Sequence, residues 1–191
     1  MPWPYQPASA HAFTRRSVIA AGALTAMAPL SGASAETILE WRKGVPIPLA
    51  RSELAAAVID RSIYVCGGFG GGQRIDRFDA DGQTWTQVAD LPAGIHHPGV
   101  ASLDGILYVA GGYGVDDHRA VDHLWAYERG EDTWTARARL PEPKGALGLV
   151  ALDGALYAAG GAFEHLGGTV SGDLLRYDPA DDRWDSLAAM P

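Results

Sequence analysis

Three things are scarce in this sequence: cysteine, positive charge and long apolar runs. The single cysteine, Cys66, lies in an apolar run beside two glycines, so no disulfide can form within the chain and a small buried side chain is indicated. The formal net charge is −8, which opposes binding to a polyanion, so we expect no nucleic-acid partner. No apolar run reaches the roughly 20 residues of a membrane-spanning helix, so we expect no membrane span in the mature chain.

The N-terminal segment has the pattern of an export signal. Arg15 and Arg16 precede a short apolar run over residues 18–30, and the small residues 33–35 follow with the spacing of a cleavage site. The arginine pair resembles a bacterial twin-arginine signal, which implies export of a folded protein. We therefore expect residues 1–35 to be a signal peptide and the mature protein to be periplasmic or extracellular.

A module of about fifty residues occurs three times, which indicates a repeat architecture. In each copy an Asp is followed by an apolar run that carries a Tyr and ends in two glycines. Further along, an aromatic residue stands seven positions before a Trp, which itself stands seven positions before a Pro. The repeated residues are Gly67, Gly68, Gly111, Gly112, Gly160, Gly161, Tyr64, Tyr108, Tyr157, Trp85, Trp134 and Trp184.

Each copy predicts four β-strands. In the first copy they are residues 54–59, 62–66, 75–79 and 85–88, with hairpin-turn chemistry over residues 80–84. The second of these segments is apolar on both faces, which is typical of a strand buried between neighbouring sheets. No long helical period occurs outside the export signal, so the pattern predicts an all-β fold.

The diglycine, the preceding Tyr and the spaced aromatic–Trp pair together resemble the kelch repeat, and the resemblance covers residues 41–191. It implies a kelch-type β-propeller, whose four-stranded blades surround a central axis. The repeated Tyr and Trp side chains then pack blade against blade, and the diglycines allow a close backbone approach. The expected parts are an N-terminal strand in residues 36–48, blade 1 in 49–92, blade 2 in 93–141 and blade 3 in 142–191.

Three blades are too few for a closed ring, because propellers close with roughly four to eight blades. Trp41 stands seven residues before Pro48, the same interval as from Trp85 to Pro92. Residues 36–48 are therefore expected to be an orphan fourth strand that completes a last blade. We interpret the chain as a partial propeller that needs further blades or a second chain to close the ring.

Function is expected in the loops, where the three copies differ. The kelch resemblance implies that the loops after the diglycines share one face with the loops that link the blades. Arg51 and Lys144 occupy equivalent positions there and could face an acidic ligand, or could be paired structurally. The candidates for ligand binding are Arg51, His96, His97, Asp116, Asp117, His118, Arg119, Lys144 and His165.

Neither a metal nor another cofactor is expected. The acids and imidazoles of residues 116–123 could bind a divalent ion, but their spacing matches no familiar metal signature. No catalytic residue is assigned, because the chain has no Gly-x-Ser-x-Gly, no phosphate loop and no His-Glu-x-x-His. The Tyr-His pair of the galactose oxidases, a class of kelch enzymes, is also missing.

Two functions are compatible with these patterns. The first is a binding or protein-interaction module of the cell envelope, with a protein or glycan ligand on one propeller face. The alternative is a carbohydrate-modifying enzyme on a kelch scaffold, similar to the sialic-acid mutarotases or, less closely, to the galactose oxidases.

Replacing Arg15 and Arg16 with lysines should block export and leave synthesis unchanged, because lysine does not reproduce the geometry of the guanidinium pair. Cell fractionation with immunoblotting measures the exported share. A matched Arg61→Lys exchange in the mature part should be exported normally. Normal export of the double-lysine protein would contradict a twin-arginine route.

Overall fold

In the computed structural model the described residues are 41–191, and they form fourteen β-strands and no helix. Within this part of the chain, therefore, no helix is available to cross a membrane. The expected signal peptide, residues 1–35, lies outside the described residues, and export stays a prediction.

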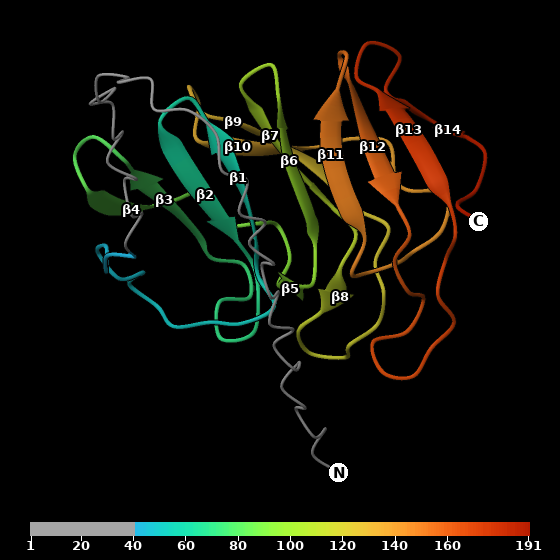
Figure 1. Ribbon diagram of the computed structural model, residues 1–191, viewed down its shortest axis with the longest axis horizontal. Helices are drawn as coiled ribbons and strands as arrows, with labels where there is room; N and C mark the ends of the chain where they lie inside the picture. Colours follow the sequence, from blue (N-terminus) through green and yellow to red (C-terminus); the bar gives the residue numbers. More distant parts are fainter. Residues whose placement is uncertain (1–40) are drawn as a thin grey trace, which may run out of the picture. The chain divides into compact units, whose positions relative to one another are not determined.

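Twelve of the strands form three four-stranded antiparallel sheets, which follow one another along the chain (Figure 1). The first sheet contains β1 (Ala55–Ile59), β2 (Ser62–Cys66), β3 (Ile75–Asp79) and β4 (Thr84–Val88). The second contains β6 (Gly99–Leu103), β7 (Ile106–Ala110), β9 (Leu124–Glu128) and β10 (Thr133–Ala136). The third contains β11 (Gly148–Leu152), β12 (Ala155–Ala159), β13 (Leu174–Asp178) and β14 (Arg183–Ser186). The prediction of an all-β fold with three four-stranded blades is confirmed.

The hydrophobic core lies between consecutive sheets. The first strands of the three sheets, β1, β6 and β11, lie side by side (Figure 1). Between the first two sheets, the buried rings of Tyr64 and Tyr127 are 6.1 Å apart. Between the second and third, the rings of Tyr108 and Tyr177 are 6.2 Å apart. Each interface thus contains the same kind of tyrosine pair, as expected for blades that bury their faces only by stacking.

In a second contact between sheets, side chains of one blade bind both the N–H and the carbonyl of a single residue of the preceding blade. Asp132 accepts a hydrogen bond from the backbone N–H of Ala89 at 2.8 Å, and the Trp134 indole donates to the carbonyl of the same Ala89 at 2.9 Å. Asp182 and Trp184 hold Ala138 of the preceding sheet with the same distances. We call this arrangement the Asp–Trp clamp, and it gives the repeated tryptophans a structural role.

The first blade has only half of the clamp. Gln83 stands where the other blades have Asp132 and Asp182, so the acceptor for the backbone N–H is missing. Trp85 still donates to a carbonyl, that of Val45, at 3.1 Å. Val45 follows Trp41 by four residues, as Ala89 follows Trp85, so this contact agrees with the expected equivalence of residues 41–48 to a fourth strand.

The expected N-terminal strand itself is not formed: residues 41–48 have no strand assignment. A strand requires backbone hydrogen bonds to a neighbour, and no third strand for this segment to pair with occurs among the described residues. The segment keeps the position of a fourth strand at Val45 without the pairing.

The diglycines bring the backbone of one blade against the next. Gly67 and Gly68 both have positive φ, +63° and +95°. A Cβ on Gly67 would lie 2.5 Å from the carbonyl oxygen of Ile95, and one on Gly111 would meet the carbonyl oxygen of Lys144. Glycine is therefore required here by close approach as well as by conformation.

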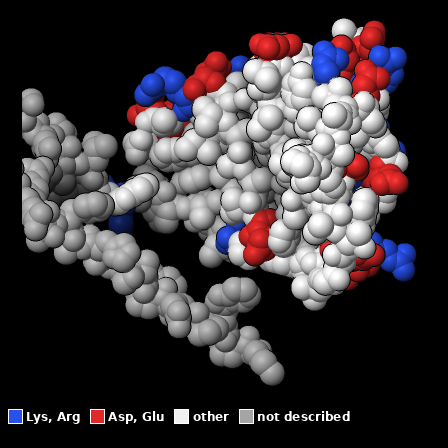
Figure 2. Space-filling model, turned by 45° about the vertical axis from the view of Figure 1, so that its right-hand side comes forward, with Lys and Arg blue, Asp and Glu red and all other residues white. Residues whose placement is uncertain are grey.

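The third sheet has an uncovered face. Val150 and Leu152 are 59% and 57% exposed, whereas their equivalents on β6, Ala101 and Leu103, are buried against β11. In the view that brings the β11–β14 side forward, charged side chains lie mainly along the margins and the middle is uncharged (Figure 2). Closure of the ring by further blades or a second chain stays a prediction.

Replacing Trp134 with alanine should lower the free energy of unfolding by about 3 kcal/mol, because a large ring and its hydrogen bond to the neighbouring sheet are lost together. Trp134→Phe keeps a ring and removes the hydrogen bond, so its effect should be nearer to about 1 kcal/mol. Guanidinium denaturation followed by circular dichroism measures both. An alanine variant as stable as the wild type would show that Trp134 does not hold the sheets together.

Candidate functional site

The loops that differ between the copies meet at one end of the sheets. β5 (Ile95–His96) pairs with β8 (Tyr113–Gly114), which joins the loop that enters blade 2 to the loop that follows its diglycine. The other two blades make the same connection by single bridges, Ser52 with Phe69 and Gly145 with Ala162. We call this end of the sheets the loop end; β5 and β8 mark it in Figure 1.

Three equivalent residues connect the blades at the loop end. Glu53, His97 and Ala146 all have positive φ, between 53° and 54°. The N–H of His97 donates to the carbonyl of Glu53 at 2.8 Å, and the N–H of Ala146 donates to the carbonyl of His97 at 2.9 Å. This chain of hydrogen bonds runs from blade 1 through blade 2 to blade 3 and fixes the backbone from which His97 projects.

Four histidines, His96, His97, His118 and His165, gather at the loop end; we call them the histidine cluster. The Nδ1 atoms of His96 and His97 are 2.7 Å apart, and Nε2 of His96 is 3.0 Å from Nδ1 of His118. The ring of His165, from blade 3, lies 4.6 Å from that of His96 and 5.0 Å from that of His118. Two loops of blade 2 and one of blade 3 therefore contribute to a single group.

Aromatic rings enclose the histidine cluster. Phe69, from blade 1, stacks on His96 with ring centroids 4.1 Å apart. The ring centroids of Tyr113 and His96 are 5.5 Å apart. The Tyr113 hydroxyl donates to the carbonyls of Ala162 and Glu164, at 3.0 and 3.2 Å. His96 is fully buried, whereas His118 is exposed. The cluster thus has a closed side and a side open to solvent.

The hydrogen bonds of the cluster follow one direction. Nε2 of His97 lies 2.9 Å from the Glu53 carboxylate, which can only accept. Nε2 of His97 therefore donates to Glu53, and in the tautomer whose Nδ1 carries no proton, that Nδ1 accepts from Nδ1–H of His96. Nε2 of His96 then accepts from His118. Burial, together with the neighbouring imidazoles of His165, His97 and His118, lowers the pKa of His96 to about 4, so His96 is neutral at pH 7.

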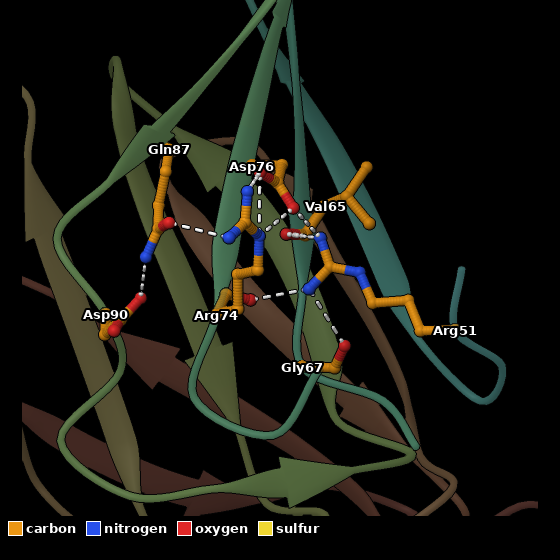
Figure 3. A network of polar contacts seen from close by, with 7 residues as sticks. All are labelled: Arg51, Val65, Gly67, Arg74, Asp76, Gln87 and Asp90. Atoms are coloured by element: carbon orange, nitrogen blue, oxygen red, sulfur yellow. Dashed lines mark hydrogen bonds and ion pairs between the residues drawn. The ribbon is translucent and has the colours of Figure 1, made fainter. Parts of the chain in front are cut away.

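The Arg51 side chain is buried within blade 1 (Figure 3). Its guanidinium donates to Asp76 at 2.6 Å and to the carbonyl of Arg74 at 2.7 Å. Asp76 also binds the Arg74 side chain, at 2.7 Å. The charge of Arg51 is thus matched inside the blade, which favours structural pairing over a free ligand contact.

Lys144 has an equivalent arrangement in blade 3. It is buried, and its Nζ lies 2.5 Å from the Asp173 carboxylate and 3.2 Å from the Ser171 hydroxyl. Hydrogen bonds from the side chains of Lys144 and Ser171 lower the pKa of Asp173. Arg51 and Lys144 thus each pair with an acid of its own blade and do not converge on a common ligand. Blade 2 has the buried apolar Ile95 at the equivalent position.

The acidic stretch of the blade 2 loop does not form a compact ligand group. Asp117 pairs with Arg119 at 3.8 Å, with both side chains largely exposed. Asp116 lines an open groove of about 750 Å³ together with Phe69 and Val115. Of this stretch, only His118 joins the histidine cluster, since His123 stacks on Trp125 instead.

Sequence reasoning included all four histidines among its candidates but missed Glu53, Phe69 and Tyr113. Glu53 could have been found from the repeat, because it occupies the same position in blade 1 as His97 does in blade 2. Phe69 and Tyr113 are likewise equivalent residues, because each directly follows a diglycine.

Comparison with known proteins gives consistent matches. Models of the Kelch motif match residues 50–92, 95–141 and 146–191. Human Kelch-like protein 38 is 35% identical over 77 residues, which are 38% of this chain and 13% of that protein. Mouse Kelch-like protein 35 is 29% identical over 154 residues, 79% of this chain and 25% of that protein. Beta-scruin of Limulus polyphemus is 29% identical over 102 residues, 48% and 11% of the two chains.

The chain thus spans a quarter or less of these relatives' length. Among solved structures, that of YjhT superposes with a TM-score of 0.70 at 17% identity, over 78% of this chain and 54% of that one. This likeness concerns the fold.

Arg51→Ala should lower the free energy of unfolding by about 3 kcal/mol, because it leaves the buried Asp76 with a single partner. The matched control is Arg119→Ala, which removes an exposed ion pair and should cost less than about 1 kcal/mol. Chemical denaturation of both proteins gives the comparison. Equal stability of the Arg51 variant and the wild type would return Arg51 to the set of candidate ligand contacts.

Proposed function

We propose that this chain, which belongs to the kelch-repeat family, is an exported interaction module of the bacterial cell envelope that binds a protein ligand with its loop end. Kelch propellers commonly bind protein partners. The observation that carries the proposal is that the repeated and the unrepeated residues have different roles. The repeated tyrosines, tryptophans and glycines are used in packing sheet against sheet, and the unrepeated side chains gather at the loop end.

The surface of the loop end suits a protein ligand of mixed character. Leu166 and Val170 in the blade 3 loop are 83% and 76% exposed. Asp116 and Asp117 in the blade 2 loop are exposed as well, so apolar and acidic side chains occur on neighbouring loops. A ligand segment that combines basic and apolar residues complements this surface.

The predicted export signal supports a place in the envelope. The net charge of −8 is compatible with a soluble exported domain, and the arginine pair at residues 15–16 supports transfer in the folded state. An interaction module that folds before export would reach its ligand already assembled.

The second candidate is a carbohydrate-modifying enzyme, and the histidine cluster is the observation that favours it. A neutral imidazole linked to a carboxylate through a second imidazole can relay a proton, which is the chemistry that opens a sugar ring. His118 is the member of the cluster that a substrate in solution could reach, since His96 is buried.

A photo-crosslinking residue at position 116 tests the interaction proposal. In cells that make the protein, p-benzoylphenylalanine in place of Asp116 should give a discrete covalent adduct with an envelope protein. The matched control is the same replacement of Asp181, an exposed acid in the turn between β13 and β14, which should give none. Adducts at both positions, or at neither, would contradict a ligand site at the loop end.

Two further measurements distinguish the ligand classes. Binding of the purified protein to a glycan array, without a protein adduct, would replace the protein ligand with a carbohydrate. Catalysed anomerisation or oxidation of a free sugar that is lost in His118→Ala would establish the enzyme instead.

A further inference from the structure

Three histidines of the cluster have the geometry of a metal site. One ring nitrogen from each of His96, His97 and His165 lies within 4.8 Å of the other two. Tetrahedral zinc sites have Zn–N bonds of about 2.0–2.1 Å, so their nitrogens are about 3.4 Å apart. The three nitrogens are therefore close enough together for rotation of the rings to direct them at one ion.

One ligand is already oriented. Histidines that bind metals usually donate their second ring N–H to a carboxylate or carbonyl, which fixes the tautomer and the ring plane. His97 has this arrangement, because its Nε2 lies 2.9 Å from Glu53. Its Nδ1 lies 2.7 Å from Nδ1 of His96, and the lone pair that accepts this hydrogen bond is the one that a metal ion would take instead. Two imidazole nitrogens at this distance require either a proton or a cation between them.

The surroundings select the kind of ion. The group consists of imidazoles packed against Phe69 and Tyr113, and no carboxylate oxygen belongs to the group of nitrogens. Imidazole ligands suit zinc and its neighbours in the first transition row, whereas magnesium and calcium require oxygen. The exposed His118, whose ring lies 5.0 Å from that of His165, stands at the open side, where a fourth ligand would enter.

We propose that His96, His97 and His165 bind one Zn²⁺ ion at the loop end, with Glu53 as the residue that positions His97 and His118 as the candidate fourth ligand. The ion joins the loops of blades 2 and 3, and through Glu53 it engages the loop of blade 1. Because the ion binds the folded arrangement of three loops, it stabilises the folded protein. No metal was predicted from the sequence; because His165 lies on a different loop from His96 and His97, no spacing along the chain indicates this group.

Calorimetric titration with ZnCl₂ tests the proposal on the EDTA-treated protein, purified without a polyhistidine tag. One ion per chain should bind and raise the midpoint of thermal unfolding, whereas Mg²⁺ should do neither. Co²⁺ should give the intense visible absorption of a four-coordinate nitrogen site.

His165→Ala should weaken Zn²⁺ binding by at least about tenfold and abolish the thermal shift, and Glu53→Gln should weaken binding by about 10–100-fold. His123→Ala is the matched control, because His123 stacks on Trp125 outside the cluster, and it should bind as the wild type does. Circular dichroism establishes that each variant is folded; if His165→Ala is not, His165→Gln takes its place.

Absence of stoichiometric binding, or equal affinity in the His165 and His123 variants, would overturn the proposal. The measurement uses no partner protein, so its result is independent of the crosslinking experiment.

Discussion

The Asp–Trp clamp is the interaction on which the arrangement of the sheets depends. At Ala89 and again at Ala138, a carboxylate takes the backbone N–H and an indole gives its N–H to the carbonyl of the same residue. The backbone N–H and the carbonyl of a residue just beyond the outer strand are thus both satisfied by the next blade. The carboxylate also accepts from a tyrosine hydroxyl at 2.6 Å, so the clamp connects the strand edge to the buried core.

Blade 1 shows that the parts of this clamp change together. It has Gln83 in place of the aspartate and Phe78 in place of the tyrosine that donates to it. A phenylalanine has no hydroxyl to satisfy, so the loss of the acceptor leaves no buried polar group unpaired. The indole of Trp85 remains and reaches Val45, which shows that the tryptophan half can act alone.

Because the clamp and the tyrosine pairs hold the sheets, the loop end is free to differ from blade to blade. The same equivalent position is Glu53 in blade 1, His97 in blade 2 and Ala146 in blade 3, although the backbone geometry is the same in all three. One backbone framework therefore presents a carboxylate, an imidazole and a methyl group in succession. The histidine cluster is a product of this variation and lies where the proposed ligand and metal sites meet.

By itself the sequence determined the all-β class, the three blades and their strands, and the structural use of the repeated glycines and tryptophans, because these depend on local spacing that recurs in every copy. It also identified all four histidines as candidates. Only the tertiary structure decided that His165 joins His96 and His97, that Glu53 orients His97, and that Arg51 and Lys144 are buried against acids of their own blades. The physical reason is that these contacts join loops far apart along the chain, whose meeting depends on how the blades stack.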